Sequence, residues 1–244
     1  MISFDRVSKD YKTGFRNKKT ALRDFSLEID EGEVFGFLGP NGAGKSTAIK
    51  ILLNLIFPTS GKVKIIGMDV GDKEARRHVG YLPENPYFYD YLNPIELLSF
   101  AGKTSGLSSH DIKESTESLL NTVGLWNDRK RAIRSYSKGM VQRVGLALAL
   151  IHNPRVVVLD EPMTGLDPIG RRQFIDLILK LKSEGKTVFF SSHILQDTER
   201  LCDRVGILVN GALVRVIDLR SEQLAGRLED TFIEEVEKAG GIKR

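Results

Sequence analysis

A single cysteine, Cys202, stands among 244 residues, so an internal disulfide is excluded. A reducing, cytoplasmic setting is the simple expectation. No apolar run approaches the roughly 18–20 residues that a membrane-spanning helix needs, and the charged, strand-like start lacks the pattern of a secretory signal. If the protein works at a membrane, we expect a different chain to cross it.

Neither sign of charge is in large excess. Lysine and arginine number 36 against 32 aspartates and glutamates, which leaves a formal net charge of +4. An imbalance this small does not by itself indicate a nucleic-acid partner. Internal repeats and low-complexity segments are also absent, and the length suits one large domain or a core with an inserted subdomain.

What the sequence does contain is a dense glycine and lysine motif. Residues 39–47 read GPNGAGKST and match the pattern G-x-x-x-x-G-K-[ST], between an apolar run at 33–38 and a helix-like run at 47–57. Glycines let successive backbone N–H groups turn inward to form an anion site, and the following helix adds its positive N-terminal end. Lys45 can then reach the β- and γ-phosphates, and the Ser46 hydroxyl can ligate Mg²⁺.

The plain alternative for this motif is a glycine-rich turn between a strand and a helix. The complete pattern in that context favours a site for a nucleoside triphosphate instead. The residues predicted to bind its phosphates are Gly39, Pro40, Asn41, Gly42, Ala43, Gly44, Lys45, Ser46 and Thr47.

Two adjacent carboxylates supply the second half of such a site. Asp160 and Glu161 follow a continuous apolar run at 156–159. Such a run is typical of a strand buried on both faces of a parallel sheet, where ligands bind at the carboxyl ends of the strands. We therefore predict that Asp160 holds Mg²⁺, directly or through water, and that Glu161 orients or deprotonates the attacking water. The alternative, acidic residues that merely end a strand, is weakened by the phosphate motif.

The order of apolar patterns predicts an α/β nucleotide-binding core with a helical insertion. Residues 1–30 and 61–70 alternate like half-exposed strands, whereas residues 84–150 carry mainly helical signals. Further strands are expected at 79–82, 155–159, 187–191, 205–209 and 212–217, and Asn210 and Gly211 should turn the last two into a hairpin. A helix is expected at 169–182, where Gly185 ends it, and another helix begins at a cap formed by Ser108.

The segment YSKGMVQR, residues 136–143, resembles the signature LSGGQ-x-Q-R of ATP-binding cassette (ABC) transporter ATPases. The matching residues are Ser137, Gly139, Gln142 and Arg143, and the departures are Tyr136, Lys138 and Met140. A serine and a glycine at a helix N-terminus form an anion site, although an ordinary N-cap at Ser137 explains the same residues. The resemblance runs over about residues 1–220.

The resemblance implies a P-loop NTPase core of mostly parallel sheet, with an N-terminal antiparallel β subdomain. A helical subdomain would be inserted at about 84–150, and a short, charged helical tail would occupy 221–244. It implies ATP and Mg²⁺ as cofactors and Mg-dependent ATP hydrolysis. Two such subunits would pack head to tail as a homodimer, in which Ser137 and Gly139 of one copy complete the ATP site of the other. The membrane partner would be a separate transmembrane permease, which places this chain at the cytoplasmic face of the membrane.

Further positions take roles from the same resemblance. Tyr11 would stack on adenine, and His193 would contact the γ-phosphate. Residues 164–167, which include Asp167, resemble the loop that contacts the opposite subunit, although Asp167 before Pro168 also suits an N-cap. Glu84 stands where the family typically has a glutamine that touches Mg²⁺, and its charge would either tighten metal binding or repel the γ-phosphate.

Glu84 and the variant signature favour an exporter-type branch of the family. The aromatic residues that follow suit either a groove for the membrane partner or the small core of the helical insertion. They are Tyr87, Phe88, Tyr89 and Tyr91.

The alternative function is a soluble mechanical ATPase of the ABC superfamily that acts on nucleic acid or the ribosome. Those relatives carry long coiled-coil insertions or two cassettes, whereas this sequence has one phosphate motif and no sustained heptad, so we expect no nucleic acid. A P-loop kinase would leave residues 136–143 unexplained. The residues do not identify the transported substrate, because the substrate's path would lie in the membrane chain.

Overall fold

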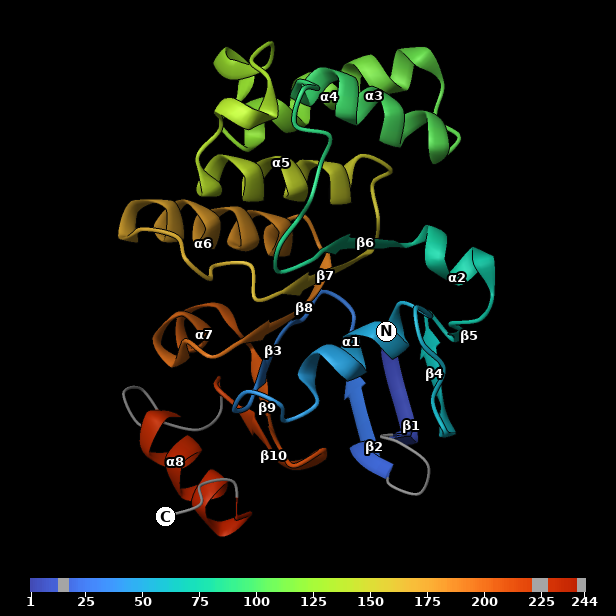
Figure 1. Cartoon of the computed structure of the whole chain (residues 1–244), viewed down its shortest axis with the longest axis vertical. Coiled ribbons are helices and arrows are strands. Elements are labelled where there is room, and N and C mark those ends of the chain that lie inside the picture. Colours follow the sequence, from blue (N-terminus) through green and yellow to red (C-terminus); the bar gives the residue numbers. More distant parts are fainter. Residues whose placement is uncertain (13–17, 221–227, 241–244) are drawn as a thin grey trace. The chain divides into compact units, whose positions relative to one another are not determined.

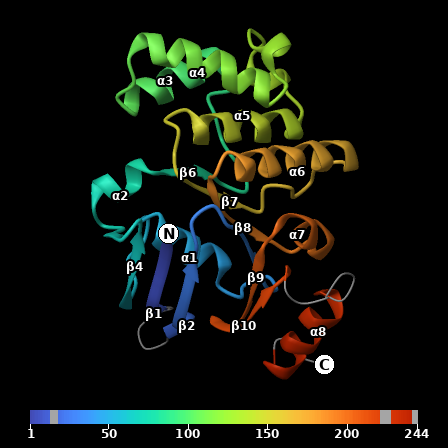
Figure 2. The same ribbon diagram turned by 180° about the vertical axis from the view of Figure 1, so that it is seen from behind.

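The computed structural model describes residues 1–12, 18–220 and 228–240. These fall into two compact units, the first built from residues 1–76 and the chain from 187 onward, and the second from Arg77–Lys186. Figures 1 and 2 show the helices and strands of both units from opposite sides.

The first unit contains an antiparallel sheet with strand order β2-β1-β4-β5. Its strands are β1 (Ile2–Lys12), β2 (Lys18–Ile29), β4 (Ser60–Ile65) and β5 (Met68–Asp69). In β2, Phe25, Leu27 and Ile29 are buried, whereas Ser26 and Glu28 between them are exposed. Because successive strand residues face opposite sides, this alternation buries one face. The expected antiparallel β subdomain is confirmed.

A second group of strands in the first unit is mainly parallel and has the order β10-β9-β3-β8. The strands are β3 (Val34–Leu38), β8 (Thr187–Ser192), β9 (Arg204–Val209) and β10 (Ala212–Asp218). β3 pairs in parallel with β8 and with β9, and every residue of β3 and β8 is buried. This is the burial expected of parallel strands covered on both faces. α7 (Leu195–Leu201) follows β8, and α8 (Leu228–Lys238) packs against α7 and β9.

The helix after the phosphate motif is shorter than expected. α1 spans Lys45–Leu52 rather than 47–57. Asn54 adopts a left-handed backbone with φ of 54°, a conformation that ends helices and that asparagine tolerates. The chain therefore leaves the helix early, and Leu55 and Phe57 are exposed.

The second unit has a parallel strand pair and a set of helices. β6 (Val79–Leu82) pairs in parallel with β7 (Val156–Asp160). α2 (Lys73–Arg77), most of which belongs to the first unit, precedes β6 in the chain. Residues 83–155, all described, contain helices and turns but no strand. Their helices are α3 (Pro94–Thr104), α4 (Ser109–Thr122), η1 (Trp126–Asp128), η2 (Ile133–Ser135) and α5 (Lys138–Leu150), and α6 (Pro168–Ser183) follows β7.

Several local expectations are confirmed by the backbone. Asn210 and Gly211 have φ values of 49° and 83°, both positive, as a two-residue hairpin turn between right-twisted strands requires. Ser108 caps α4 by accepting a hydrogen bond from the Asp111 N–H. Gly185 follows α6 with φ of 77°. Of the tail expected at 221–244, residues 228–238 are helical, and 221–227 and 241–244 lie outside the described residues.

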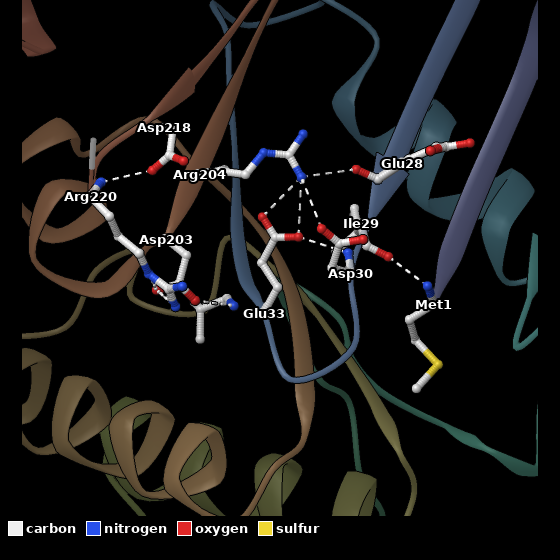
Figure 3. A network of polar contacts seen from close by, with 10 residues as sticks. Met1, Glu28, Ile29, Asp30, Glu33, Asp203, Arg204, Asp218 and Arg220 are labelled. Carbon is white, nitrogen blue, oxygen red and sulfur yellow. Dashed lines mark hydrogen bonds and ion pairs between the residues drawn. The ribbon is translucent and has the colours of Figure 1, made fainter. Parts of the chain in front are cut away.

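A polar network fixes the amino ends of β3 and β9 (Figure 3). Arg204 donates to both carboxylate oxygens of Glu33 at 3.3 Å, and Arg220 donates to Asp203 at 2.7 Å. Asp203 also accepts from the Val34 N–H at 3.0 Å. Burial raises the pKa of Glu33 even though the nearby Arg204 charge opposes the change.

Candidate functional site

The glycine-rich segment forms a tight connection between β3 and α1. The Ala43 N–H donates to the Pro40 carbonyl at 3.1 Å, and Gly44 precedes the helix with φ of 115°. A Cβ at Gly39 would lie 2.4 Å from the Leu208 carbonyl oxygen, and one at Gly44 would lie 2.4 Å from the Ala21 oxygen. Only glycine fits at both positions, because the backbones of β9 and β2 leave no room there for a side chain.

Lys45 opens α1 and turns back toward the start of this loop. Its side chain is 7% exposed, and its Nζ donates to the Gly39 carbonyl at 2.6 Å. Ser46 is exposed and Thr47 is half-buried in the same first helical turn. One place thus gathers the loop, a buried ammonium and a helix N-terminus that no side chain caps.

His193 leaves the sheet beside the phosphate loop. Leu38 of β3 is in register with Ser192 of β8, so the residues that follow, Gly39 and His193, emerge at the same edge. His193 is exposed. Tyr11 belongs to the antiparallel sheet, where it is 37% exposed and Lys9 Nζ lies 5.3 Å from its ring centroid. The first unit therefore carries the phosphate loop, His193 and Tyr11.

Asp160 and Glu84 are brought to one edge of the second unit. Leu82 of β6 is in register with Leu159 of β7, so Asp160 ends its strand where the chain from β6 leads into Glu84. Asp160 is 6% exposed and Glu84 is exposed. Burial, together with the charges of Asp160 and Glu84, raises the pKa of Tyr81 to about 12. Two carboxylates thus flank a phenol that keeps its proton at neutral pH.

Glu161 has an unusual backbone for a non-glycine residue. Its φ is 49°, in the left-handed region, and such conformations are concentrated at functional sites. The Thr164 hydroxyl donates to Glu161 Oε2 at 3.3 Å, and the Thr164 N–H donates to the Glu161 carbonyl at 3.1 Å. The turn after β7 therefore holds the Glu161 carboxylate in place.

The signature segment and the Asp167 loop lie together in the second unit. Ser137 caps α5, and its hydroxyl accepts from the Met140 N–H at 3.3 Å. A Cβ on Gly139 would sit 3.7 Å from Leu166 Cδ2, and one on Gly165 would sit 2.5 Å from Lys138 Nζ. Lys138, a departure from the signature, thus packs against the loop before α6.

Asp167 caps that helix. Its Oδ1 accepts a hydrogen bond from the Gly170 N–H at 2.6 Å, and Pro168 occupies the first helical turn. The N-cap interpretation of Asp167 is therefore confirmed, and a second role in subunit contact stays a prediction.

Gln142 is a positioning residue that the sequence reasoning did not assign to the site. Its side chain is 1% exposed, and Nε2 donates to the backbone carbonyl of Glu84 at 2.8 Å. It ties the signature helix to the Glu84 segment. The sequence does single out Gln142, because it matches the signature of the family. The motif does not show, however, that its side chain binds the Glu84 backbone.

Three of the four aromatic residues after Glu84 are exposed. These are Tyr87, Tyr89 and Tyr91, and the last two have ring centroids 5.9 Å apart. Phe88 is half-buried and faces α5, since a Cβ on Gly145 would lie 3.6 Å from its ring. The tyrosines therefore remain available for contact with another molecule, and Phe88 packs within the second unit.

The donors present suit a phosphate-bound magnesium ion. Among the described residues, no group of three or more His, Cys, Asp or Glu side chains is arranged so that it could hold a metal ion by itself. Ser46 offers a hydroxyl in the first unit, and Asp160 offers a carboxylate in the second. Mg²⁺ usually takes only one or two protein oxygens and completes its octahedron with phosphates and water. The glycine-lined loop and the Lys45 ammonium correspondingly suit a triphosphate.

Two features are typical of nucleotide-binding proteins of the P-loop class. One is the glycine loop with a buried lysine at the start of a helix, and the other is the carboxylate that ends a parallel strand. A family model described as ABC transporter matches residues 22–164, more than half of the chain. The chain therefore belongs to the ABC transporter family.

Several relatives are named as ATP-binding proteins. An uncharacterised ABC transporter ATP-binding protein of Synechocystis is 48% identical over 212 residues, which cover 85% of this chain and 60% of that protein. A similar Nostoc protein is 48% identical, with 63% of its length covered, so the chain spans less than two thirds of both. The lantibiotic transport ATP-binding protein SrtF of Streptococcus pyogenes is 37% identical, with 88% of this chain and 89% of SrtF covered.

Solved structures agree on the fold. A dimeric ATP-binding cassette in a post-hydrolysis state, bound to ADP and Pi, superposes with a TM-score of 0.83 at 28% identity, covering 91% of this chain and all of the other. An ATP-binding subunit of an ABC transporter superposes with a TM-score of 0.81 at 29% identity, covering 98% and 99%. The predicted P-loop NTPase fold is confirmed.

In the part of the chain that the structure describes, no helix combines the length and the apolar character that crossing a membrane requires.

Proposed function

We propose that this chain is the ATP-binding and ATP-hydrolysing subunit of an ABC transporter. The observation that carries the proposal is the phosphate loop, in which Lys45 is buried against Gly39 at the start of α1. Family membership and the ATP-binding names of the relatives support it. ATP closes a two-site homodimer, hydrolysis reopens it, and the cycle drives a separate transmembrane permease from the cytoplasmic face of the membrane.

The proposed roles are assigned to residues of each unit. The loop at residues 39–47 binds the phosphates, and Lys45 neutralises their charge. Ser46, Asp160 and Glu84 hold Mg²⁺, which when bound polarises the phosphate oxygens and offsets their charge. Glu161 accepts a proton from the attacking water, a role that the Thr164 contact suits because it fixes the carboxylate.

The remaining residues recognise the ends of the nucleotide and the second subunit. Tyr11 stacks on adenine, and His193 contacts the γ-phosphate. The partner subunit's signature contributes Ser137 and Gly139, and the Asp167 loop contacts the opposite copy. A dimeric cassette with a similar fold supports this arrangement.

Export is the direction of transport that we propose. It rests on Glu84 in place of glutamine and on the variant signature, and relatives named for lantibiotic transport, bacitracin transport and linearmycin resistance support it. The exposed tyrosines after Glu84 would contact the permease.

The test of catalysis is Glu161→Gln, with the exposed Glu184→Gln on the same unit as its control. Removing a general base should lower kcat for ATP by at least about a hundredfold, while ATP with Mg²⁺ now accumulates dimers in sedimentation velocity. The control should hydrolyse ATP like the wild type. Hydrolysis by Glu161→Gln within twofold of the wild-type rate would contradict the role given to Glu161.

The test of the transporter role is purification of the tagged chain from native membranes in mild detergent. A polytopic membrane protein at near-equal stoichiometry supports the proposal, and its sequence narrows the substrate. Recovery of ribosomes or nucleic acid in its place would overturn the transporter role and leave only the ATPase.

A further inference from the structure

The turn between β9 and β10 is hydrogen-bonded to the phosphate loop. The Gly211 N–H donates to the Ala43 carbonyl at 2.9 Å. The Gly211 carbonyl accepts from the Arg23 N–H of β2 at 2.8 Å. The loop that would bind phosphate is therefore attached to a turn that is itself anchored on the antiparallel sheet.

The same turn and its neighbours leave the loop little room to move. Cβ atoms at Gly39 and Gly44 would collide with the carbonyl oxygens of Leu208 and Ala21, both at 2.4 Å. A Cβ at Gly211 would also lie only 2.8 Å from the Ala21 oxygen. The end of β9, the turn and β2 thus form a close-fitting support for the loop.

The hydrogen bond at Ala43 has a direct consequence for ligand binding. The Ala43 carbonyl and the Gly44 N–H belong to one planar, trans peptide unit, so they point in opposite directions. Holding the carbonyl toward Gly211 therefore directs the Gly44 N–H away from the turn. Because backbone N–H groups of this loop are the proposed phosphate ligands, the turn orients one of them.

The C-terminal helix α8 holds the other side of the turn. Asn210 Nδ2 donates to the Ala239 carbonyl at 3.3 Å, directly after the end of α8. Arg215 of β10 pairs with Glu235 of α8 at 3.2 Å, and Val236 is buried. Figures 1 and 2 both draw α8 beside the hairpin of β9 and β10.

We propose that the Asn210–Gly211 turn is a positioning element for the phosphate loop and that α8 sets the position of the turn. The docking of α8 and the binding of nucleotide are then coupled, although α8 need not touch the nucleotide. Such coupling is reciprocal: whatever docked α8 adds to nucleotide affinity, bound nucleotide adds to the docking of α8. The inference rests on nucleotide binding as proposed above and assigns the tail a role in it.

The first test replaces Asn210 by glycine. Asn210→Gly keeps the left-handed backbone, which glycine adopts freely, and removes only the amide that reaches Ala239. Asn153→Gly is the matched control, because Asn153 has φ of 51° and its Oδ1 accepts from Lys186 Nζ at 2.7 Å in the second unit. Both variants lose one side-chain hydrogen bond at a left-handed asparagine.

Calorimetric titration with MgADP measures binding without hydrolysis. We expect the Kd of Asn210→Gly to rise threefold or more, with KM for ATP rising in parallel and kcat at saturating ATP within twofold of the wild type. Asn153→Gly should keep the wild-type Kd, with a comparable change in Tm. Equal Kd values for Asn210→Gly and the wild type would overturn the positioning role, whereas a wild type that binds no nucleotide would overturn the proposed function as well.

Hydrogen exchange of the full chain tests the reciprocal effect. MgADP should slow amide exchange in residues 228–239 of the wild type, and this protection should be smaller in Asn210→Gly. ADP is the probe because it lacks the γ-phosphate on which the dimer is proposed to close. Unchanged exchange of α8 in the wild type at saturating MgADP would overturn the coupling.

Discussion

Lys45 is a charged side chain held in a largely buried position. Its exposed fraction is 7%, and its Nζ donates to the Gly39 carbonyl. Burying a cation costs free energy unless partners surround it. Phosphate oxygens would add opposite charge at this place, which is the role proposed above for Lys45.

Replacing Lys45 by methionine separates its effect on nucleotide affinity from its effect on the stability of the chain. Lys45→Met keeps an unbranched side chain and removes the charge, so we expect the affinity for MgATP to fall at least tenfold, the order of magnitude of a lost charge-assisted hydrogen bond. Without nucleotide, Tm should stay within about 3 °C of the wild-type value. Lys50→Met, on the exposed side of the same helix, is the control for calorimetry and thermal unfolding. Unchanged affinity in Lys45→Met would exclude Lys45 from the site.

At the scale of elements, the starts of helices carry much of the candidate site. Gly44 precedes α1, Ser137 caps α5 and Asp167 caps α6. Each of these residues therefore has a structural task at the same place as its proposed task in nucleotide or subunit contact. A substitution at a helix start changes both unless the replacement is also a good cap.

Asp167 can be tested with a pair of substitutions. Asp167→Ala removes the cap of α6, which should cost about 1 kcal/mol and lower Tm by about 2–4 °C in a chain of this size. Asp167→Ser keeps a capping oxygen, so its Tm should stay near the wild-type value while ATP hydrolysis falls severalfold through the lost subunit contact. Wild-type hydrolysis by Asp167→Ser would mean that Asp167 is only a cap.

At the scale of the whole molecule, the candidate residues are divided between two units. The chain leaves the first unit after residue 76 and returns to it at 187. The phosphate loop, Tyr11 and His193 belong to the first unit, and the carboxylates with the signature segment belong to the second. The roles proposed for hydrolysis are therefore assigned to residues of both units.

The stability of the whole chain should depend on pH through Glu33. Because burial raises its pKa above 4.5, the folded chain binds this proton more tightly than the unfolded chain does. The resulting stabilisation is fully present below pH 4.5 and is lost as the pH rises through the folded pKa. We expect the Tm of Glu33→Gln to rise relative to the wild type as the pH increases from 4.5.

Thermal unfolding across pH 4 to 8 measures this difference. Glu28→Gln, whose side chain is exposed, is the control and should follow the wild type at every pH. A constant Tm difference between Glu33→Gln and the wild type would show that the carboxyl has the same pKa in both states.

The local pattern of apolar and turn residues predicted several elements correctly. It failed at α1, where the backbone conformation of one residue ended a helix that the pattern continued. The apolar run before Asp160 and the Asn210–Gly211 turn identified β7 and the final hairpin. The helix after the phosphate loop was expected to reach residue 57, but it ends at Leu52 because Asn54 adopts a left-handed backbone. Apolar residues beyond Asn54 continued the helical period in the sequence without continuing the helix.

The sequence by itself determined the phosphate motif, the buried strand ahead of the two carboxylates and the resemblance to a family, because each depends on residues close together in the chain. Only the tertiary structure decided that Gln142 binds the Glu84 backbone, that Lys138 covers Gly165 and that Gly211 holds Ala43. These contacts join segments far apart in the chain. Strand register and helix packing place such segments side by side, and no local pattern of residue types specifies that placement.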